Sequence, residues 1–141
     1  MSTDINDFPL AWRWTKPAHA VLPGPILHAL QPLEPQQAER LFRHGAELLR
    51  VSTDRSKIHS ATANSDATRS WLNALPWPPQ ARVSIAWSRS AAISLPWHAF
   101  ILYWDDFCYP SSDDAFISAE DGGSVLAWTH NEVFEFAENA V

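Results

Sequence analysis

The hydrophobic period of this chain changes near its middle, and that change constrains the fold more than any other feature. Between Pro35 and Leu49 apolar residues recur at helical spacing, whereas from Arg82 onward they alternate with polar residues. Helices followed by a run of strands favour an α+β domain. We therefore expect N-terminal helices packed on one face of an antiparallel sheet of five or six strands, formed by the second half of the chain.

Two principal helices are predicted in the first half. One begins at Pro35, with Glu34 as its cap, because proline suits the first helical position. Its expected buried stripe is Ala38, Leu41, Phe42, Gly45, Leu48 and Leu49. The other is expected at 66–75, with Ser65 as its N-cap.

Six segments of the second half carry strand signals. Residues 83–87 alternate between apolar and small side chains, which is typical of a half-buried strand. Residues 97–104 are almost continuously apolar and predict a central strand that is covered on both faces. Further strands are expected at 91–95, 115–119, 125–128 and 133–136, with a hairpin signal at Asp121-Gly122-Gly123.

The length of 141 residues and a hydrophobic content of 46% indicate a single domain, 1–141, with one core. We expect a frayed tail at 1–8 and a mobile loop at 50–64, since neither shows a clear period. Seven of the eight tryptophans divide into two groups. Those expected in the core are Trp71, Trp87, Trp97 and Trp128, and those near proline-rich segments, expected to be more exposed, are Trp12, Trp14 and Trp77.

Charge and cysteine content exclude several classes of function. The net charge is −6, and residues 82–141 carry nine acidic side chains against only Arg82 and Arg89, which argues against a nucleic-acid binder. A single cysteine rules out an intrachain disulfide and a cysteine zinc cluster. No apolar run reaches ~18 residues, and the first residues lack a signal-peptide pattern, so we expect a cytoplasmic protein of bacterial type that does not enter a membrane.

The densest polar cluster runs from Asp105 to Asp114. Four carboxylates within ten residues repel each other unless a cation or a basic partner compensates, and the aromatic side chains among them supply apolar contact. The predicted partner-binding residues are Asp105, Asp106, Phe107, Tyr109, Asp113 and Asp114. We expect a non-catalytic protein that binds a basic protein partner; the plainer interpretation is a solvated loop whose aspartates cap turns.

Two further hypotheses stay open. A small metal-dependent hydrolase would use Asp105 and Asp106 with His98 or His130, because carboxylates and imidazoles are metal ligands. A homo-oligomer would bury surplus aromatic surface between subunits. Cys108 is a poor candidate nucleophile, since neighbouring carboxylates raise a thiol pKa. No phosphate-binding glycine loop, nucleophile elbow or HExxH motif is present, and no cofactor is expected.

Two stretches carry a resemblance to known proteins. Residues 12–33 read WRWTKPAHAVLPGPILHALQPL, and the later core contains YWDDFCYPSSDD at 103–114. Together they resemble small uncharacterised single-domain bacterial proteins of the toxin-immunity type. The resemblance implies a cytoplasmic protein that binds and blocks a basic partner, and it implies no catalytic residue.

Overall fold

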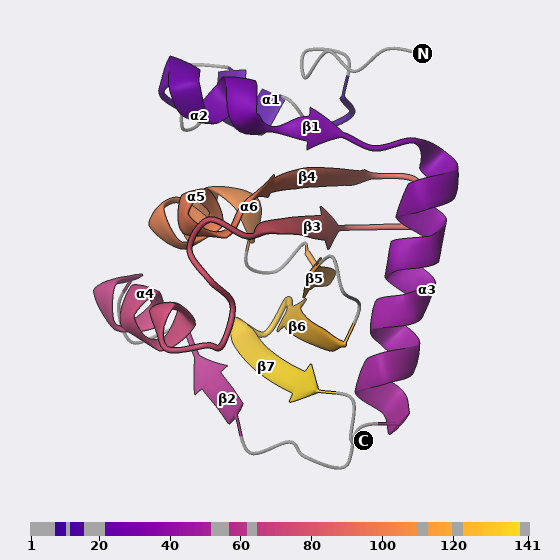
Figure 1. Cartoon of the computed structure of the whole chain (residues 1–141), viewed down its shortest axis with the longest axis vertical. Coiled ribbons are helices and arrows are strands. Elements are labelled where there is room, and N and C mark those ends of the chain that lie inside the picture. Colours follow the sequence, from indigo (N-terminus) through magenta and orange to yellow (C-terminus); the bar gives the residue numbers. More distant parts are fainter. Residues whose placement is uncertain are drawn as a thin grey trace.

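The computed structural model describes residues 8–10, 12–15, 22–51, 57–61, 65–109, 113–119 and 123–138. At their centre lies an antiparallel sheet with the strand order β1-β4-β3-β5-β6-β7-β2 (Figure 1). The strands are β1 (Gln31–Pro32), β2 (Lys57–Ser60), β3 (Arg82–Ala86), β4 (Ala92–Pro96), β5 (Ala115–Ala119), β6 (Ser124–Thr129) and β7 (Val133–Glu138). Strands β3 to β7 come from the second half of the chain, which confirms the predicted α+β class and its antiparallel sheet.

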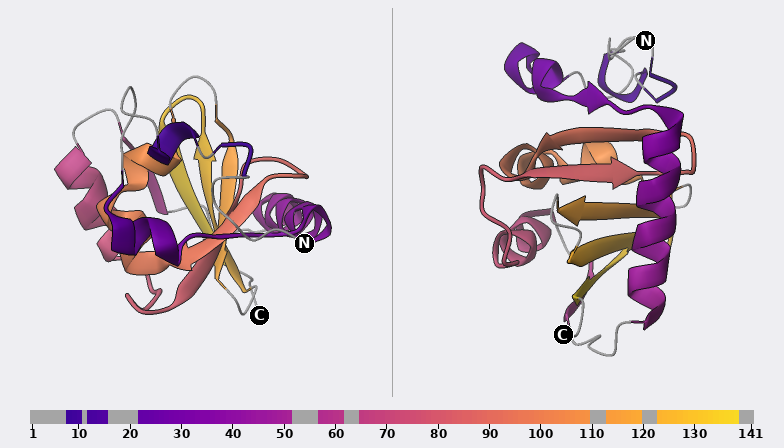
Figure 2. Two further views of the ribbon diagram at one scale, coloured as in Figure 1. Left: turned by 90° about the horizontal axis from the view of Figure 1, so that it is seen from above. Right: turned by 45° about the vertical axis from the view of Figure 1, so that its right-hand side comes forward.

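Helices cover both faces of the sheet. Helix α3 (Pro35–Val51) lies against one face, and α4 (Ser65–Asn73), α5 (Trp97–Leu102) and α6 (Trp104–Phe107) lie against the other (Figure 2). Side chains alternate along each strand, so Ile85 of β3 joins the main core while Ala86 packs against Ala38 of α3. The prediction of N-terminal helices on one face holds for α3, whereas α4 joins the opposite face because its Leu72 enters the main core.

Helix α3 begins at Pro35, as predicted. The backbone N–H of Glu34 donates a hydrogen bond to the Gln37 side chain at 3.0 Å, which satisfies one backbone donor beside the helix N-terminus. The expected stripe faces the sheet, with Ala38, Gly45 and Leu48 buried. A Cβ atom at Gly45 would lie 2.7 Å from Cβ of Phe116 on β5, so glycine lets this helix approach the sheet closely.

Residues 97–104 are not a central strand, and that prediction is wrong. The segment forms α5 and the start of α6, with Pro96 directly before the first helical residue. Trp97, Ala99 and Phe100 are buried in it. A continuously apolar run occurs both in a buried strand and in a helix that is covered on most sides. The hydrophobic period therefore did not distinguish the two.

The amino-terminal segment also differs from expectation. Trp12 and Trp14 lie in α1 (Trp12–Thr15) and not in an extended stretch. Trp14 is fully buried and donates from Nε1 to the carbonyl of Asp106 at 2.9 Å. Phe8 is buried as well and stacks on Trp14 with 6.0 Å between the ring centroids, so the frayed tail does not include it; residues 1–7 lie outside the described residues.

Two further predictions need correction: the exposure of Trp77 and the mobile loop at 50–64. Trp77 is buried and donates from Nε1 to the Ser124 hydroxyl at 2.8 Å, although its proline neighbours predicted exposure. Within the expected loop 50–64, residues 57–60 form β2, which pairs with the open edge of β7. A four-residue polar strand is too short to show a period, and 52–56 and 62–64 lie outside the described residues. None of the described helices is both long and apolar enough to cross a membrane.

Candidate functional site

The predicted binding segment begins with two carboxylates in the first turn of α6. Asp105 is exposed and Asp106 is partly buried. Burial raises the pKa of Asp106, the charge of Asp105 raises it further, and the nearby Arg69 of α4 opposes this shift. Burial and the neighbouring Asp105 therefore oppose ionisation of Asp106, and Arg69 favours it.

The next part of the segment lies in the interior. Phe107 is fully buried and stacks with Phe100 at 5.9 Å between ring centroids, so the expected aromatic anchor has no free surface. Cys108 is buried beside it, and burial, with the charge of Asp113, raises the pKa of its thiol. A buried thiol that resists ionisation is a poor nucleophile.

Asp113 holds the amino-terminal segment in place. Its carboxylate accepts hydrogen bonds from both terminal nitrogens of Arg13, at 2.7 and 2.9 Å, and a third from the backbone N–H of Tyr109 at 2.9 Å. The guanidinium of Arg13 lies 4.0 Å from the centroid of the Tyr109 ring. Asp113 and Tyr109 thus bind another part of the same chain, and Asp113 keeps only 6% of its surface exposed.

Asp114 lies apart from these residues, just before β5. The backbone N–H and the ring Nδ1 of His130 lie 2.9 and 3.0 Å from its Oδ1. Partial burial acts to raise the pKa of Asp114, but the two hydrogen bonds and the charge of His130 outweigh it and lower that pKa. The six predicted residues therefore fall into three places: the adjacent Asp105 and Asp106 on α6, the group Phe107, Tyr109 and Asp113, and Asp114, which contacts His130.

The alternative metal ligands are not brought together. His98 is exposed on α5, and His130 is engaged with Asp114, whereas Asp105 and Asp106 lie on α6. Across the part of the chain that the structure describes, no group of three or more His, Cys, Asp or Glu side chains is placed to hold a metal ion. The predicted ligand set has no common centre.

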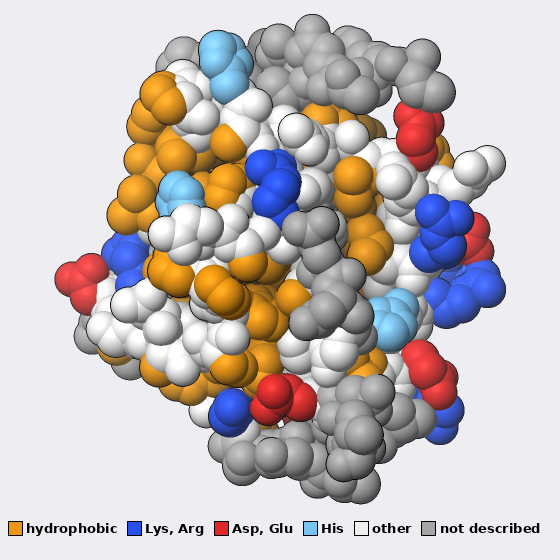
Figure 3. Space-filling view, in the orientation of Figure 1, with side chains coloured by type: hydrophobic (Ala, Val, Ile, Leu, Met, Phe, Trp, Pro, Cys, Tyr) orange, Lys and Arg blue, Asp and Glu red, His pale blue; other side chains and the backbone are white. Residues whose placement is uncertain are grey.

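An exposed apolar side chain shortly precedes Asp105 and Asp106 in the chain. Leu102, at the end of α5, has 51% of its surface exposed, and it borders a shallow hollow between α4 and α5 of about 400 Å³. Arg69 donates from Nε to the Leu102 carbonyl at 3.1 Å and pairs with Asp66 at 3.1 Å. We name Leu102, Asp105 and Asp106 together the Leu102 face. In Figure 3, hydrophobic side chains gather around α4 and α5, whereas charged side chains follow α3.

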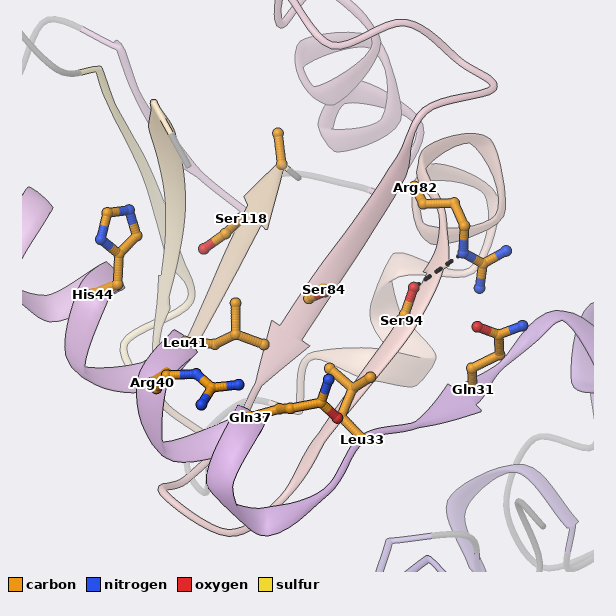
Figure 4. A pocket seen from close by; sticks show the side chains of 11 residues that line it. Gln31, Leu33, Gln37, Arg40, Leu41, His44, Arg82, Ser84, Ser94 and Ser118 are labelled. Carbon is orange, nitrogen blue, oxygen red and sulfur yellow. Dashed lines mark hydrogen bonds between the residues drawn. The ribbon is translucent and has the colours of Figure 1, made fainter. Parts of the chain in front are cut away.

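A second candidate site lies between α3 and the sheet. Its floor is a row of serines on three adjacent strands, because Ser84 of β3 is paired with Ser94 of β4 and with Ser118 of β5. Gln31 of β1 pairs with Ser94 and extends the row. Arg40 projects from α3 on one side and Arg82 lies over the Ser94 end on the other (Figure 4). We name this the serine groove, and its volume is about 530 Å³.

Sequence reasoning missed the serine groove. The alternation of 83–87 correctly separated Val83 and Ile85 from Ser84, but it did not show which residues of other strands would lie beside Ser84. The sequence does carry a small polar residue on the same face of β3, β4 and β5. Recognising that these residues are neighbours requires the register between the strands.

No protein-family model matches the chain, and searches of curated proteins and of solved structures find no match either.

Proposed function

We propose that the protein is a non-catalytic binding protein, of the immunity type that its sequence resembles, and that a basic protein partner docks on the Leu102 face. The observation that carries the proposal is the exposure of Leu102 at the end of α5, directly before the helix α6 that holds Asp105 and Asp106. An apolar anchor surrounded by charged groups is the usual organisation of an energetically important contact. Leu102 takes the anchoring role that the sequence assigned to Phe107 and Tyr109.

The electrostatics of this face favour a cationic partner. Asp106 has a raised pKa because it is partly buried beside Asp105, and the neighbouring Arg69 is shared with Asp66. A lysine or arginine from a partner would relieve the repulsion between the two carboxylates. The net charge of −6 would also attract a basic protein over longer distances and increase the rate of association.

The competing hypotheses draw less support. The metal-dependent hydrolase needs Asp105 and Asp106 near His98 or His130, and these groups have no common centre among the described residues. The homo-oligomer would cover Leu102, or the exposed Ile58 of β2, with a second copy, and a monomer in light scattering contradicts it. A cytoplasmic location and a bacterial source belong to the same proposal as the immunity role.

The test is capture of a partner from lysate of the source cells at low and high salt. The variants are D105N/D106N and L102A, and the control is E39Q/E47Q, which removes the same charge from exposed positions on α3, the helix of the other face. We expect a basic protein that the wild type and the control retain at low salt and that both variants lose. Capture of no basic protein, or equal loss by the control, contradicts the proposal.

A further inference from the structure

We propose that the serine groove is a second binding site, independent of the Leu102 face, and that it takes the phosphate group of a small phosphorylated molecule. The site is formed by Ser84, Ser94 and Ser118 on the floor, with Arg40 and Arg82 on opposite sides (Figure 4). Three properties support the assignment: the balance of hydrogen-bond donors, the local charge, and a buried hydroxyl that no other described group satisfies.

The groove offers donors and few acceptors. Ser94 Oγ accepts from Arg82 Nε at 3.0 Å, which leaves the hydroxyl hydrogen of Ser94 to be donated elsewhere. Arg82 also donates one NH2 hydrogen to the Ala29 carbonyl at 3.0 Å and keeps its other terminal hydrogens. The side-chain oxygen of Gln37 accepts a hydrogen bond from the backbone N–H of Glu34. The side-chain NH2 of Gln37 can therefore donate into the groove. A phosphate group offers only acceptors and has three terminal oxygens to receive such donors.

The local charge has the sign opposite to that of the whole protein. Arg40 and Arg82 contribute two positive charges, and the described lining residues include no carboxylate. The molecule as a whole carries −6, so a long polyanion such as a nucleic acid would be repelled outside the groove while a small anion would reach the two arginines. A volume of about 530 Å³ accommodates a phosphate together with a small organic group.

Ser118 provides the independent observation. Only 3% of its surface is exposed, and its hydroxyl has no hydrogen-bond partner among the described residues. A buried polar atom without a partner costs stability, so such atoms are rare and need an explanation. In Figure 4 the hydroxyl points toward α3, between Leu41 and His44, on the side of the groove that Arg40 borders. A ligand oxygen in the groove would satisfy it.

The test is calorimetric titration of the whole protein in a phosphate-free buffer with inorganic phosphate, ribose 5-phosphate, citrate and a single-stranded DNA oligonucleotide. The variants are R40Q and S118A, with R43Q as the control, because Arg43 is on the same helix but pairs with Glu39. Arg82 is left intact since its hydrogen bonds to Ser94 and Ala29 have a structural role.

We expect ribose 5-phosphate to bind at least as tightly as phosphate, and R40Q and S118A each to weaken both by about tenfold, the loss expected for one hydrogen bond to a charged group. R43Q should bind like the wild type, and the melting temperature of S118A should not fall. No heat with either phosphate, or equal weakening by R43Q, overturns the proposal. Tighter binding of citrate or DNA overturns the assignment to a small phosphate.

Discussion

Arg13 and Asp113 are a hundred residues apart in the sequence and form a two-point ion pair in the interior, with both side chains 6% exposed. The pair connects α1 to Asp113, which lies shortly before β5. The Asp113 carboxylate also accepts a hydrogen bond from the Tyr109 backbone. The acidic segment therefore contains one carboxylate with a structural role, Asp113, and more accessible carboxylates at Asp105, Asp106 and Asp114.

Breaking this pair on one side should be strongly destabilising. D113N removes the carboxylate that pairs with the buried Arg13 guanidinium, and the expected loss is about 3–5 kcal/mol of unfolding free energy. Urea unfolding measures it. D66N removes one partner of the exposed Asp66–Arg69 pair and should cost less than about 1 kcal/mol. A D113N loss as small as that of D66N would contradict the structural role of Asp113.

Replacing Gly45 by alanine tests the close approach of α3 to the sheet, and the same replacement at Gly24 is the control. In G45A the new Cβ would lie 2.7 Å from Phe116 Cβ, so the helix must shift. We expect a strain of about 1–3 kcal/mol, offset by at most about 1 kcal/mol from better helix propensity. At Gly24 nothing lies within 4 Å of the added Cβ, and G24A should not destabilise. Thermal unfolding compares them, and equal melting temperatures would contradict the packing.

The Asp105–Asp106 pair should make stability depend on pH. The pKa of Asp106 is raised in the folded protein by burial and by Asp105, so folding is penalised as the pH rises through that raised pKa and the carboxyl ionises. D106N removes the penalty. Its melting temperature should exceed that of the wild type at pH 7, and the difference should disappear below the ordinary carboxyl pKa. A difference that persists at pH 3 would place its cause elsewhere.

Ser118 and Ser124 should respond in opposite directions to replacement by alanine. The Ser118 hydroxyl is buried without a partner among the described residues, so S118A should stabilise by about 1 kcal/mol. The Ser124 hydroxyl accepts from Trp77 Nε1 at 2.8 Å, so S124A leaves a buried donor unsatisfied and should destabilise by about 1–3 kcal/mol. Chemical denaturation at neutral pH measures both, and destabilisation by S118A would show that its hydroxyl is already satisfied.

Local patterns predicted much of the fold. Helix α3 followed from apolar spacing and Pro35, and β3 followed from the alternation of Val83 and Ile85 with small residues. Residues 97–104 were assigned wrongly because Trp97, Ala99 and Phe100 face the core from a helix, where the strand period has no meaning. Strands β1 and β2 are too short to carry a period, and they exist because β4 and β7 offer open edges.

The candidate sites were predicted less completely, for a physical reason. The adjacent carboxylates Asp105 and Asp106 were proposed as binding residues from their charge alone. The burial of Phe107 and Asp113 depends on contacts with Phe100 and Arg13 that no local pattern encodes. The serine groove likewise depends on strand register, which only the folded sheet defines.

The measurement that tests the binding role most directly is the salt dependence of affinity for the captured basic partner. Purified partner would be titrated against the wild type, D105N/D106N and E39Q/E47Q across a range of salt concentrations. We predict that affinity falls with salt for the wild type and the control, and that D105N/D106N binds at least about tenfold more weakly at low salt with a flatter dependence. Superimposable curves for the wild type and D105N/D106N would contradict the assignment of the Leu102 face as the binding surface.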